Sequence, residues 1–84
     1  MTRKEALLKK EETLSKHSDC IVLCRVGNFY EAYDMDAIEL KFSCGLYVAI
    51  RDGGIGQVAG FPHHRLDIYL RELIRGGNRV MILE

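Results

Sequence analysis

The stretch IVLCRVGNFYEAY, residues 21–33, decides the fold of this chain. Its first six residues are apolar apart from Arg25, and such a run predicts a strand over residues 20–26. The pair Gly27-Asn28 then indicates a turn or bulge, after which aromatic residues predict a second strand that ends at Tyr33. The chain is therefore expected to build a β-sheet from this point outward.

Side chains along the second strand are expected to alternate between the two faces of the sheet, because successive strand residues point in opposite directions. Phe29, Glu31 and Tyr33 then share one face. Tyr30 and Ala32 share the other face, so Tyr30 is expected to pack inside. A large apolar ring beside an acid can stack on a nucleic-acid base while the carboxyl group meets the base edge. This pattern makes Phe29 and Glu31 candidate binding residues.

The remaining sequence predicts further helices and strands, without internal repeats. In order, the expected elements are a helix over residues 3–16, strands over 20–26 and 29–33, a helix from 34 or 36 to about 43, strands over 46–50 and 57–60, a helix over 66–74 and a strand over 79–83. This order predicts an α/β fold, a mixed β-sheet flanked by about three helices. Residues 1–84 are expected to form a single domain, with 1–19 as N-terminal helix and lead-in and 20–84 as the core.

The first helix is expected to be amphipathic. Ala6, Leu7 and Leu14 fall at spacings compatible with one face, which would pack on the core. Residues 9–12, with the sequence KKEE, are expected to form a solvated side.

Turn and cap signals mark the later boundaries. Asp34 or Asp36 is expected to cap the second helix, and His63-His64 to be capping or surface residues at the start of the third. Gly76-Gly77 is the expected stop of that third helix. The glycine-rich residues 53–56 predict a hairpin turn and not a phosphate-binding loop, because the required lysine is missing.

The charge balance limits the possible partners. The formal net charge is zero, with 12 basic and 12 acidic residues, which argues against strong non-specific binding to nucleic acid. A basic group near the C-terminus comprises Arg65, Arg71, Arg75 and Arg79. An acidic block in the middle comprises Glu31, Asp34, Asp36 and Glu39. Any DNA contact is therefore expected to use a local basic patch, although a solvated helix face explains the arginine group equally well.

Cysteine use and the lack of a long apolar run favour a reduced, cytoplasmic protein without a membrane segment. Cys20 and Cys24 would lie about 13 Å apart along a strand, too far to share one metal ion. No metal site is therefore expected. The sequence shows no nucleophile–base pair with meaningful spacing, so neither catalysis nor a cofactor is expected.

Several motifs in order resemble the N-terminal mismatch-recognition domain (domain I) of the MutS family of DNA mismatch repair proteins. The matching segments are RVG at 25–27, FYEAY at 29–33, a strand that ends in the basic residue 51, VAGFPHH at 58–64, the helix at 66–73 and the strand at 77–84. The resemblance runs from Ile21 to Glu84, and it implies the fold of that domain.

The resemblance also implies a partner and a role for three residues. The partner is double-stranded DNA with a mismatch or a small loop, together with other mismatch repair domains or proteins. Phe29 would be wedged into the duplex and stack on a mispaired or unpaired base, Glu31 would hydrogen-bond that base, and Arg51 would contact the DNA backbone. Glu31 would hold its contact best if its pKa were raised enough to donate a proton.

Other interpretations stay open. Asn28 and His63 stand where the family usually has Asp and Tyr, and no ATP-binding glycine loop occurs in this sequence. Without the resemblance, Phe29 would be a core residue and Glu31 a solvated strand acid. The main alternative function is a protein-interaction or regulatory module that kept the fold and lost DNA mismatch binding.

Overall fold

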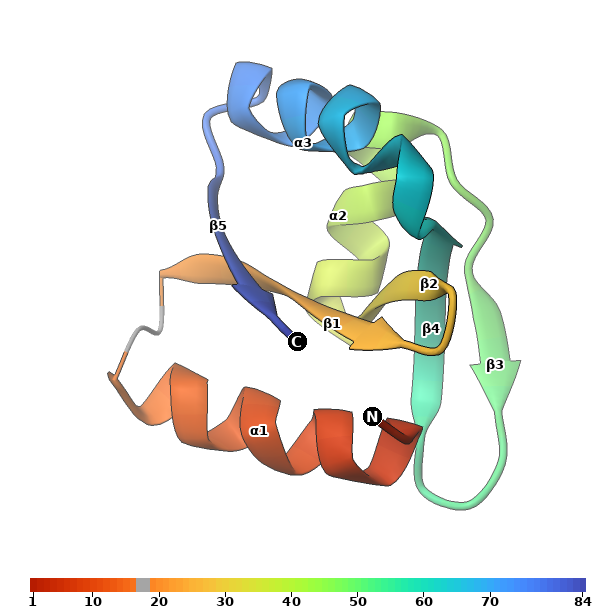
Figure 1. The fold of residues 1–84 in the computed structure, drawn as a ribbon. Helices are drawn as coiled ribbons and strands as arrows, with labels where there is room; N and C mark the ends of the chain where they lie inside the picture. Colours follow the sequence, from red (N-terminus) through yellow and green to blue (C-terminus); the bar gives the residue numbers. More distant parts are fainter. Residues whose placement is uncertain (17–18) are drawn as a thin grey trace.

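A computed structural model describes residues 1–16 and 19–84 of the chain (Figure 1). The described elements are α1 (Arg3–Lys16), β1 (Cys20–Val26), β2 (Phe29–Tyr33), α2 (Met35–Cys44), β3 (Ala49–Arg51), β4 (Gly56–Pro62), a 3-10 turn η1 (His63–Arg65), α3 (Leu66–Arg75) and β5 (Arg79–Leu83). The strands form one sheet in the order β3-β4-β2-β1-β5. Its β1 and β5 are parallel and the other neighbours are antiparallel, which confirms the predicted mixed sheet and α/β fold.

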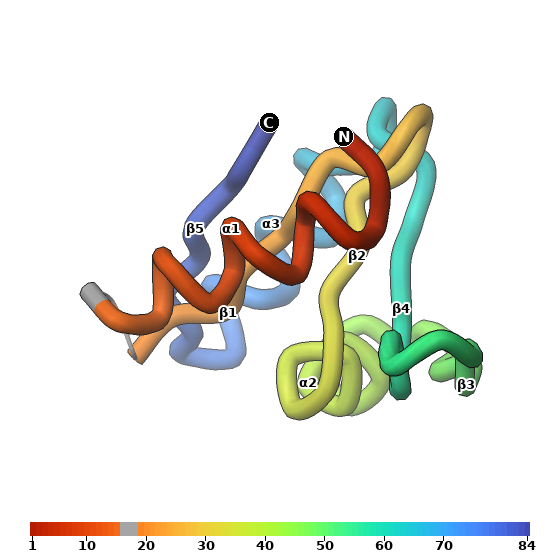
Figure 2. Tube along the Cα trace, turned by 90° about the horizontal axis from the view of Figure 1, so that it is seen from below, coloured from red at the N-terminus to blue at the C-terminus, as the bar shows by residue number. Residues whose placement is uncertain are grey.

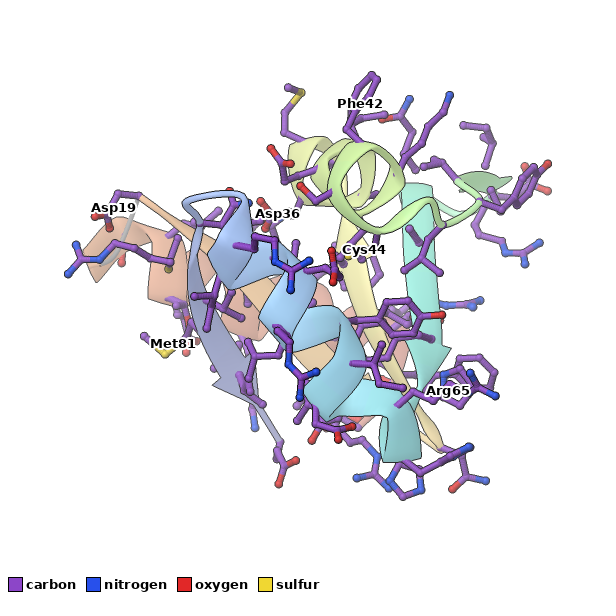
Figure 3. The ribbon with its side chains drawn as sticks, turned by 90° about the horizontal axis from the view of Figure 1, so that it is seen from above. Asp19, Asp36, Phe42, Cys44, Arg65 and Met81 are labelled. Carbon is purple, nitrogen blue, oxygen red and sulfur yellow. The ribbon has the colours of Figure 1, made fainter. Side chains whose placement is uncertain are left out.

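The sheet carries a core on each face. One core joins the inward side chains of β1, β2 and β4 to α2 and α3, and it contains Tyr30 and Ala32. The other joins the sheet to α1, and it contains Tyr33. Figure 2 shows α1 crossing the sheet on one side, and Figure 3 views the molecule from the side of α2 and α3. The predicted alternation along β2 is therefore confirmed.

Two predicted strand boundaries are wrong. The third strand begins at Ala49 and not at residue 46, and its three residues pair with β4 from Gly56 to Val58. Leu46 and Val48 instead pack against the core from the connection that leads out of α2. The returning strand is longer than predicted and runs to Pro62, since β2 pairs with it as far as Phe29. Strand propensity alone therefore does not set these boundaries, because packing and pairing with distant segments also act on them.

The caps also differ from the prediction. Asp34 stands at the N-cap of α2, but its φ is 54° and its side chain makes no capping hydrogen bond. The carboxylate of Asp36 accepts a hydrogen bond from the Val22 backbone N–H, 3.1 Å away, and so ties α2 to β1. His63 and His64 lie in the 3-10 turn before α3, where His64 is exposed.

Lys10 is buried, so its predicted place on a solvated side of α1 is wrong. Its side chain lies one helical turn from Ala6 and one from Leu14, on the face that meets the sheet. Lys10 is 7% exposed, and its Nζ donates to the carbonyl oxygen of Tyr33 at 2.8 Å. The same ammonium lies 3.7 Å from the Asp36 carboxylate. Lys10 therefore anchors α1 to the end of β2.

We expect Lys10→Ala to lower the free energy of unfolding by about 2–4 kcal/mol, because the Tyr33 carbonyl and the Asp36 carboxylate would lose their buried cation. Lys9→Ala is the matched control, since Lys9 is exposed, and it should change stability by no more than about 0.5 kcal/mol. Urea denaturation followed by circular dichroism measures both. Equal effects of the two substitutions would contradict the anchoring role.

Candidate functional site

A pocket of about 440 Å³ brings together the three residues that the sequence singled out. Phe29 and Glu31 of β2 line it with Arg51 of β3. It is also lined by Arg3 of α1, by residues 46–47 before β3 and by Gly60 of β4. The pocket thus lies where the first turn of α1 meets the β2-β4-β3 side of the sheet.

Phe29 is an exposed aromatic side chain on a firmly held strand. It is the first residue of β2 and is 47% exposed, so the interpretation as a core residue is wrong. The strand starts after a two-residue turn in which Gly27 has a φ of 60°, a conformation that suits glycine. The next residue, Tyr30, is buried against Phe61 with 5.9 Å between ring centroids. Tyr30 therefore fixes the backbone from which the Phe29 ring projects.

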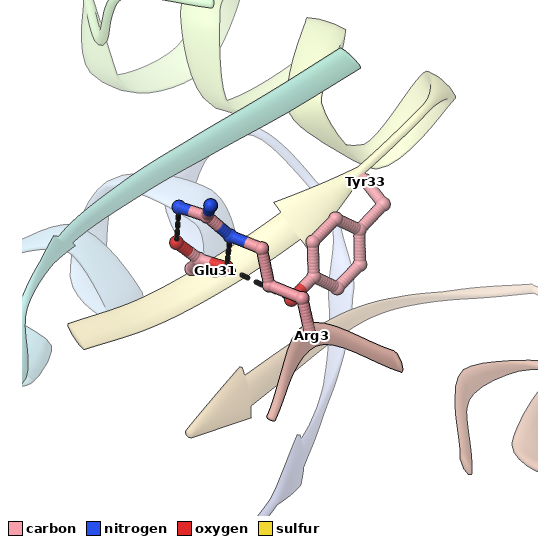
Figure 4. A network of polar contacts seen from close by, with 3 residues as sticks. All are labelled: Arg3, Glu31 and Tyr33. Atoms are coloured by element: carbon pink, nitrogen blue, oxygen red, sulfur yellow. Dashed lines mark hydrogen bonds and ion pairs between the residues drawn. The ribbon is translucent and has the colours of Figure 1, made fainter. Parts of the chain in front are cut away.

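Glu31 is buried and fully engaged, so the interpretation as a solvated strand acid is wrong. Its residue exposure is 6%. Arg3 donates from Nε to Oε1 at 2.9 Å and from Nη2 to Oε2 at 2.8 Å, and the Tyr33 hydroxyl donates to Oε1 at 2.9 Å (Figure 4). The physical reason is that α1 covers this face of β2 and brings a cation with it. The carboxylate is neutralised by Arg3 and held in place from two directions.

Arg3 is the site residue that the sequence analysis missed. A capping box sets its position: the Glu5 N–H donates to Thr2 Oγ1 at 3.2 Å, and the Thr2 N–H donates to Glu5 Oε1 at 3.1 Å. The Thr-x-x-Glu signal at residues 2–5 indicates where the helix begins. It does not indicate that Arg3 meets Glu31, 28 residues away.

The electrostatics of the cluster keep Arg3 and Tyr33 in fixed protonation states. The hydrogen bond to Glu31 raises the pKa of Arg3, so the guanidinium stays charged. Burial, followed by the charge of Glu31, raises the pKa of Tyr33, so its hydroxyl stays a donor. A guanidinium and a phenol that both donate suit an ionised Glu31 that accepts.

Arg51 ends β3 at the edge of the sheet and is exposed. No ion pair engages it among the residues that the structure describes. Two members of the C-terminal arginine group do have acidic partners: Arg75 lies 3.4 Å from Glu72, and Arg79 lies 2.6 Å from Asp19. Arg51 is therefore a cation at the pocket that no carboxylate of the described chain neutralises.

Asn28 and His63, which differ from the residues usual in the family's motifs, lie side by side. The backbone N–H of His63 donates to the carbonyl oxygen of Asn28 at 2.8 Å, which joins the turn before β2 to the end of β4. Because both bonding groups belong to the backbone, this link does not depend on either side chain.

The described residues hold no cluster of three or more His, Cys, Asp or Glu side chains suited to a metal ion. Cys24 is buried, and its burial raises the pKa of the thiol to about 11. Within residues 1–16 and 19–84, every helix is too short or too polar to cross a bilayer.

The family described as MutS domain I matches residues 9–84, nearly the whole chain. The chain belongs to the MutS domain I family. This membership confirms the resemblance to the N-terminal mismatch-recognition domain of MutS. Arg3 precedes the matched residues, whereas Phe29, Glu31 and Arg51 lie within them.

Curated relatives support the same assignment. The chain is 48% identical over 73 residues to the DNA mismatch repair protein MutS of Parabacteroides distasonis, and 47% identical over 73 residues to that of Bacteroides thetaiotaomicron. Each alignment covers 83% of this chain and 8% of the relative. The MutS of Salinibacter ruber is 43% identical over 72 residues, which cover 82% of this chain and 8% of the relative. The chain therefore spans about a twelfth of the length of these relatives.

Gly60 permits the close approach of β4 to Glu31 at the pocket. An added Cβ would lie 2.7 Å from the Tyr30 carbonyl oxygen, a backbone atom that cannot move aside. We expect Gly60→Ala to lower the free energy of unfolding by about 1–3 kcal/mol. Gly76→Ala is the control, because its added Cβ would meet the end of the Asn78 side chain at 3.3 Å. Chemical denaturation compares the two, and equal costs would contradict a special constraint at Gly60.

Proposed function

We propose that this chain is a non-catalytic DNA-binding module that reads mispaired or unpaired bases in double-stranded DNA. The observation that carries the proposal is the exposed Phe29 ring, which borders the Arg51 pocket in a chain of the MutS domain I family. The relatives bear the name of a DNA mismatch repair protein. In this proposal Phe29 is the wedge, Glu31 contacts the base, and Arg51 contacts the DNA backbone.

The wedge role rests on a difference in deformation cost. Inserting an apolar ring between bases unstacks a step at a cost of a few kcal/mol, and that cost falls where pairing is already weak. A defective site is also easier to kink than a perfect duplex. A ring on a rigid strand suits this task, because the strand backbone loses little conformational entropy when the ring binds. Phe29 has that support from its buried neighbour Tyr30.

The charge distribution supports contact through a few cations. With a net charge of zero, the chain has no overall positive potential that would attract DNA to its whole surface. Arg51 supplies a local positive charge at the pocket, and Arg3 compensates the negative charge of Glu31 beside it. Affinity is therefore expected to be modest. Strong binding and any repair activity would belong to a larger protein or to other mismatch repair domains.

A second candidate function is a protein-interaction or regulatory module. Exposed apolar side chains on α2 and near β3 favour it: Met35, Phe42, Tyr47 and Ile50. Phe42 projects outward from α2 in Figure 3. Binding to this surface would depend little on salt, whereas phosphate contacts weaken steeply as salt rises.

The wedge is tested with Phe29→Ala. We expect the parent to bind a duplex with a G·T mispair or an unpaired T more tightly than the perfect duplex in low-salt fluorescence anisotropy. Phe29→Ala should abolish this preference and keep the fold, since the side chain is half-exposed. Phe42→Ala is the matched control, because Phe42 is 78% exposed and does not line the pocket. A preference that survives Phe29→Ala would refute the wedge, and salt-insensitive binding lost in Phe42→Ala would favour the interaction module.

The backbone contact is tested with Arg51→Gln. Loss of one phosphate contact should weaken binding to perfect and defective duplexes alike and reduce the slope of log Kd against log salt concentration by about 1. Arg75→Gln, on the exposed side of α3, is the control and should leave the slope unchanged. Equal slopes for parent and Arg51→Gln would remove Arg51 from the interface.

A further inference from the structure

The Glu31 carboxylate is closed to a ligand by the N-terminal helix. Three hydrogen bonds from Arg3 and Tyr33 occupy its two oxygens. The side chain of Glu31 is 9% exposed, whereas that of Arg3 is 39% exposed. A base that enters the pocket therefore meets the Arg3 guanidinium before it meets the carboxylate.

We propose that Arg3 determines how strongly this chain distinguishes a defective duplex from a perfect one, because its guanidinium competes with the base for Glu31. The inference rests on the proposed base contact of Glu31. It adds a residue that lies outside the segment matched by the MutS domain I family.

The competition follows from the position of the guanidinium between the pocket and the buried carboxylate. A carboxylate offers about four lone-pair positions; three are used here, and the Glu31 side chain is only 9% exposed behind the guanidinium, which limits access to the fourth. The Tyr33 hydroxyl is buried behind Glu31 and cannot be replaced from the pocket. A base edge that bonds Glu31 must therefore displace at least one of the two bonds from Arg3. These bonds are charge-assisted and bidentate, the strong class of hydrogen bond.

Arg3 can leave Glu31 without unfolding α1. The Thr2–Glu5 capping box holds the first turn, Ala6 is buried, and Lys10 anchors the helix one turn further on. The released guanidinium would then lie beside DNA phosphates, which can take the place of the carboxylate as its anionic partner. DNA binding thus exchanges one anion for another at Arg3 and frees Glu31 for the base.

The ratio of the two dissociation constants, perfect over defective duplex, isolates this effect. Arg3→Gln removes the guanidinium, and with it a phosphate contact, so it should weaken binding to both duplexes. Because the guanidinium no longer competes for Glu31, the ratio should nevertheless rise about tenfold, which corresponds to one charge-assisted hydrogen bond. Arg3→Lys keeps the charge and loses the bidentate geometry, so its ratio should be intermediate. Lys4→Gln, an exposed neighbour on the same helix, removes equal charge and should leave the ratio unchanged.

Glu31 supplies the decisive control. In a Glu31→Ala background, Arg3→Gln should no longer raise the ratio of the two dissociation constants, because there is no carboxylate to release. Thermal unfolding by circular dichroism confirms that each variant is folded. In the parent, the Arg3 Nε–H signal in NMR should shift when the defective duplex binds, because its acceptor changes from the Glu31 carboxylate to a phosphate.

The outcomes separate this inference from the proposed function. A parent preference that is lost in Phe29→Ala but unchanged or lowered in Arg3→Gln would overturn the inference and leave the proposed function standing. A ratio of one for the parent and for every Arg3 variant would overturn both. A ratio that rises equally with and without Glu31 would overturn the competition, since the effect would then not pass through the carboxylate.

Discussion

The alternation of side chains along β2 is the constraint on which the rest of the structure depends. Tyr30 and Ala32 enter the core beneath α2 and α3, while Glu31 and Tyr33 face α1. A shift of one residue would exchange these sets and place a carboxylate in an apolar core. The register with β1 and β4 is therefore strongly specified, and it leaves Phe29 at the start of the strand, outside both cores.

The two faces of the sheet are held by different chemistry. The face under α2 and α3 is apolar and aromatic, with Phe61 4.7 Å from Tyr69 between ring centroids. The face under α1 also buries charge, namely Lys10 and Glu31, and Arg3 and Lys10 donate to acceptors on β2. Buried charges require partners in good geometry, so only one position of α1 on the sheet is favourable. In that position Arg3 lies at the candidate site.

Much of the site was predictable from short-range pattern. Phe29, Glu31 and Arg51 were singled out from motifs, and the structure places all three around one pocket. Their roles on DNA stay predictions. The burial of Glu31 and the participation of Arg3 were not predictable, because the partners lie 28 residues apart and no local signal joins them. Lys10 is an intermediate case: it was predicted on a solvated side, although its spacing of four residues from Ala6 and from Leu14 could have indicated the packed face.

By itself the sequence determined the elements, their order and the faces of the central strand, because hydrophobic periodicity, glycine turns and helix caps act over a few residues. Only the tertiary structure decided where the third strand starts, that Glu31 is buried and that Arg3 is its cationic partner. Those outcomes depend on pairing partners and desolvation between segments far apart in the chain. For a carboxylate, the environment that folding builds decides whether it is offered to a ligand or held within the protein.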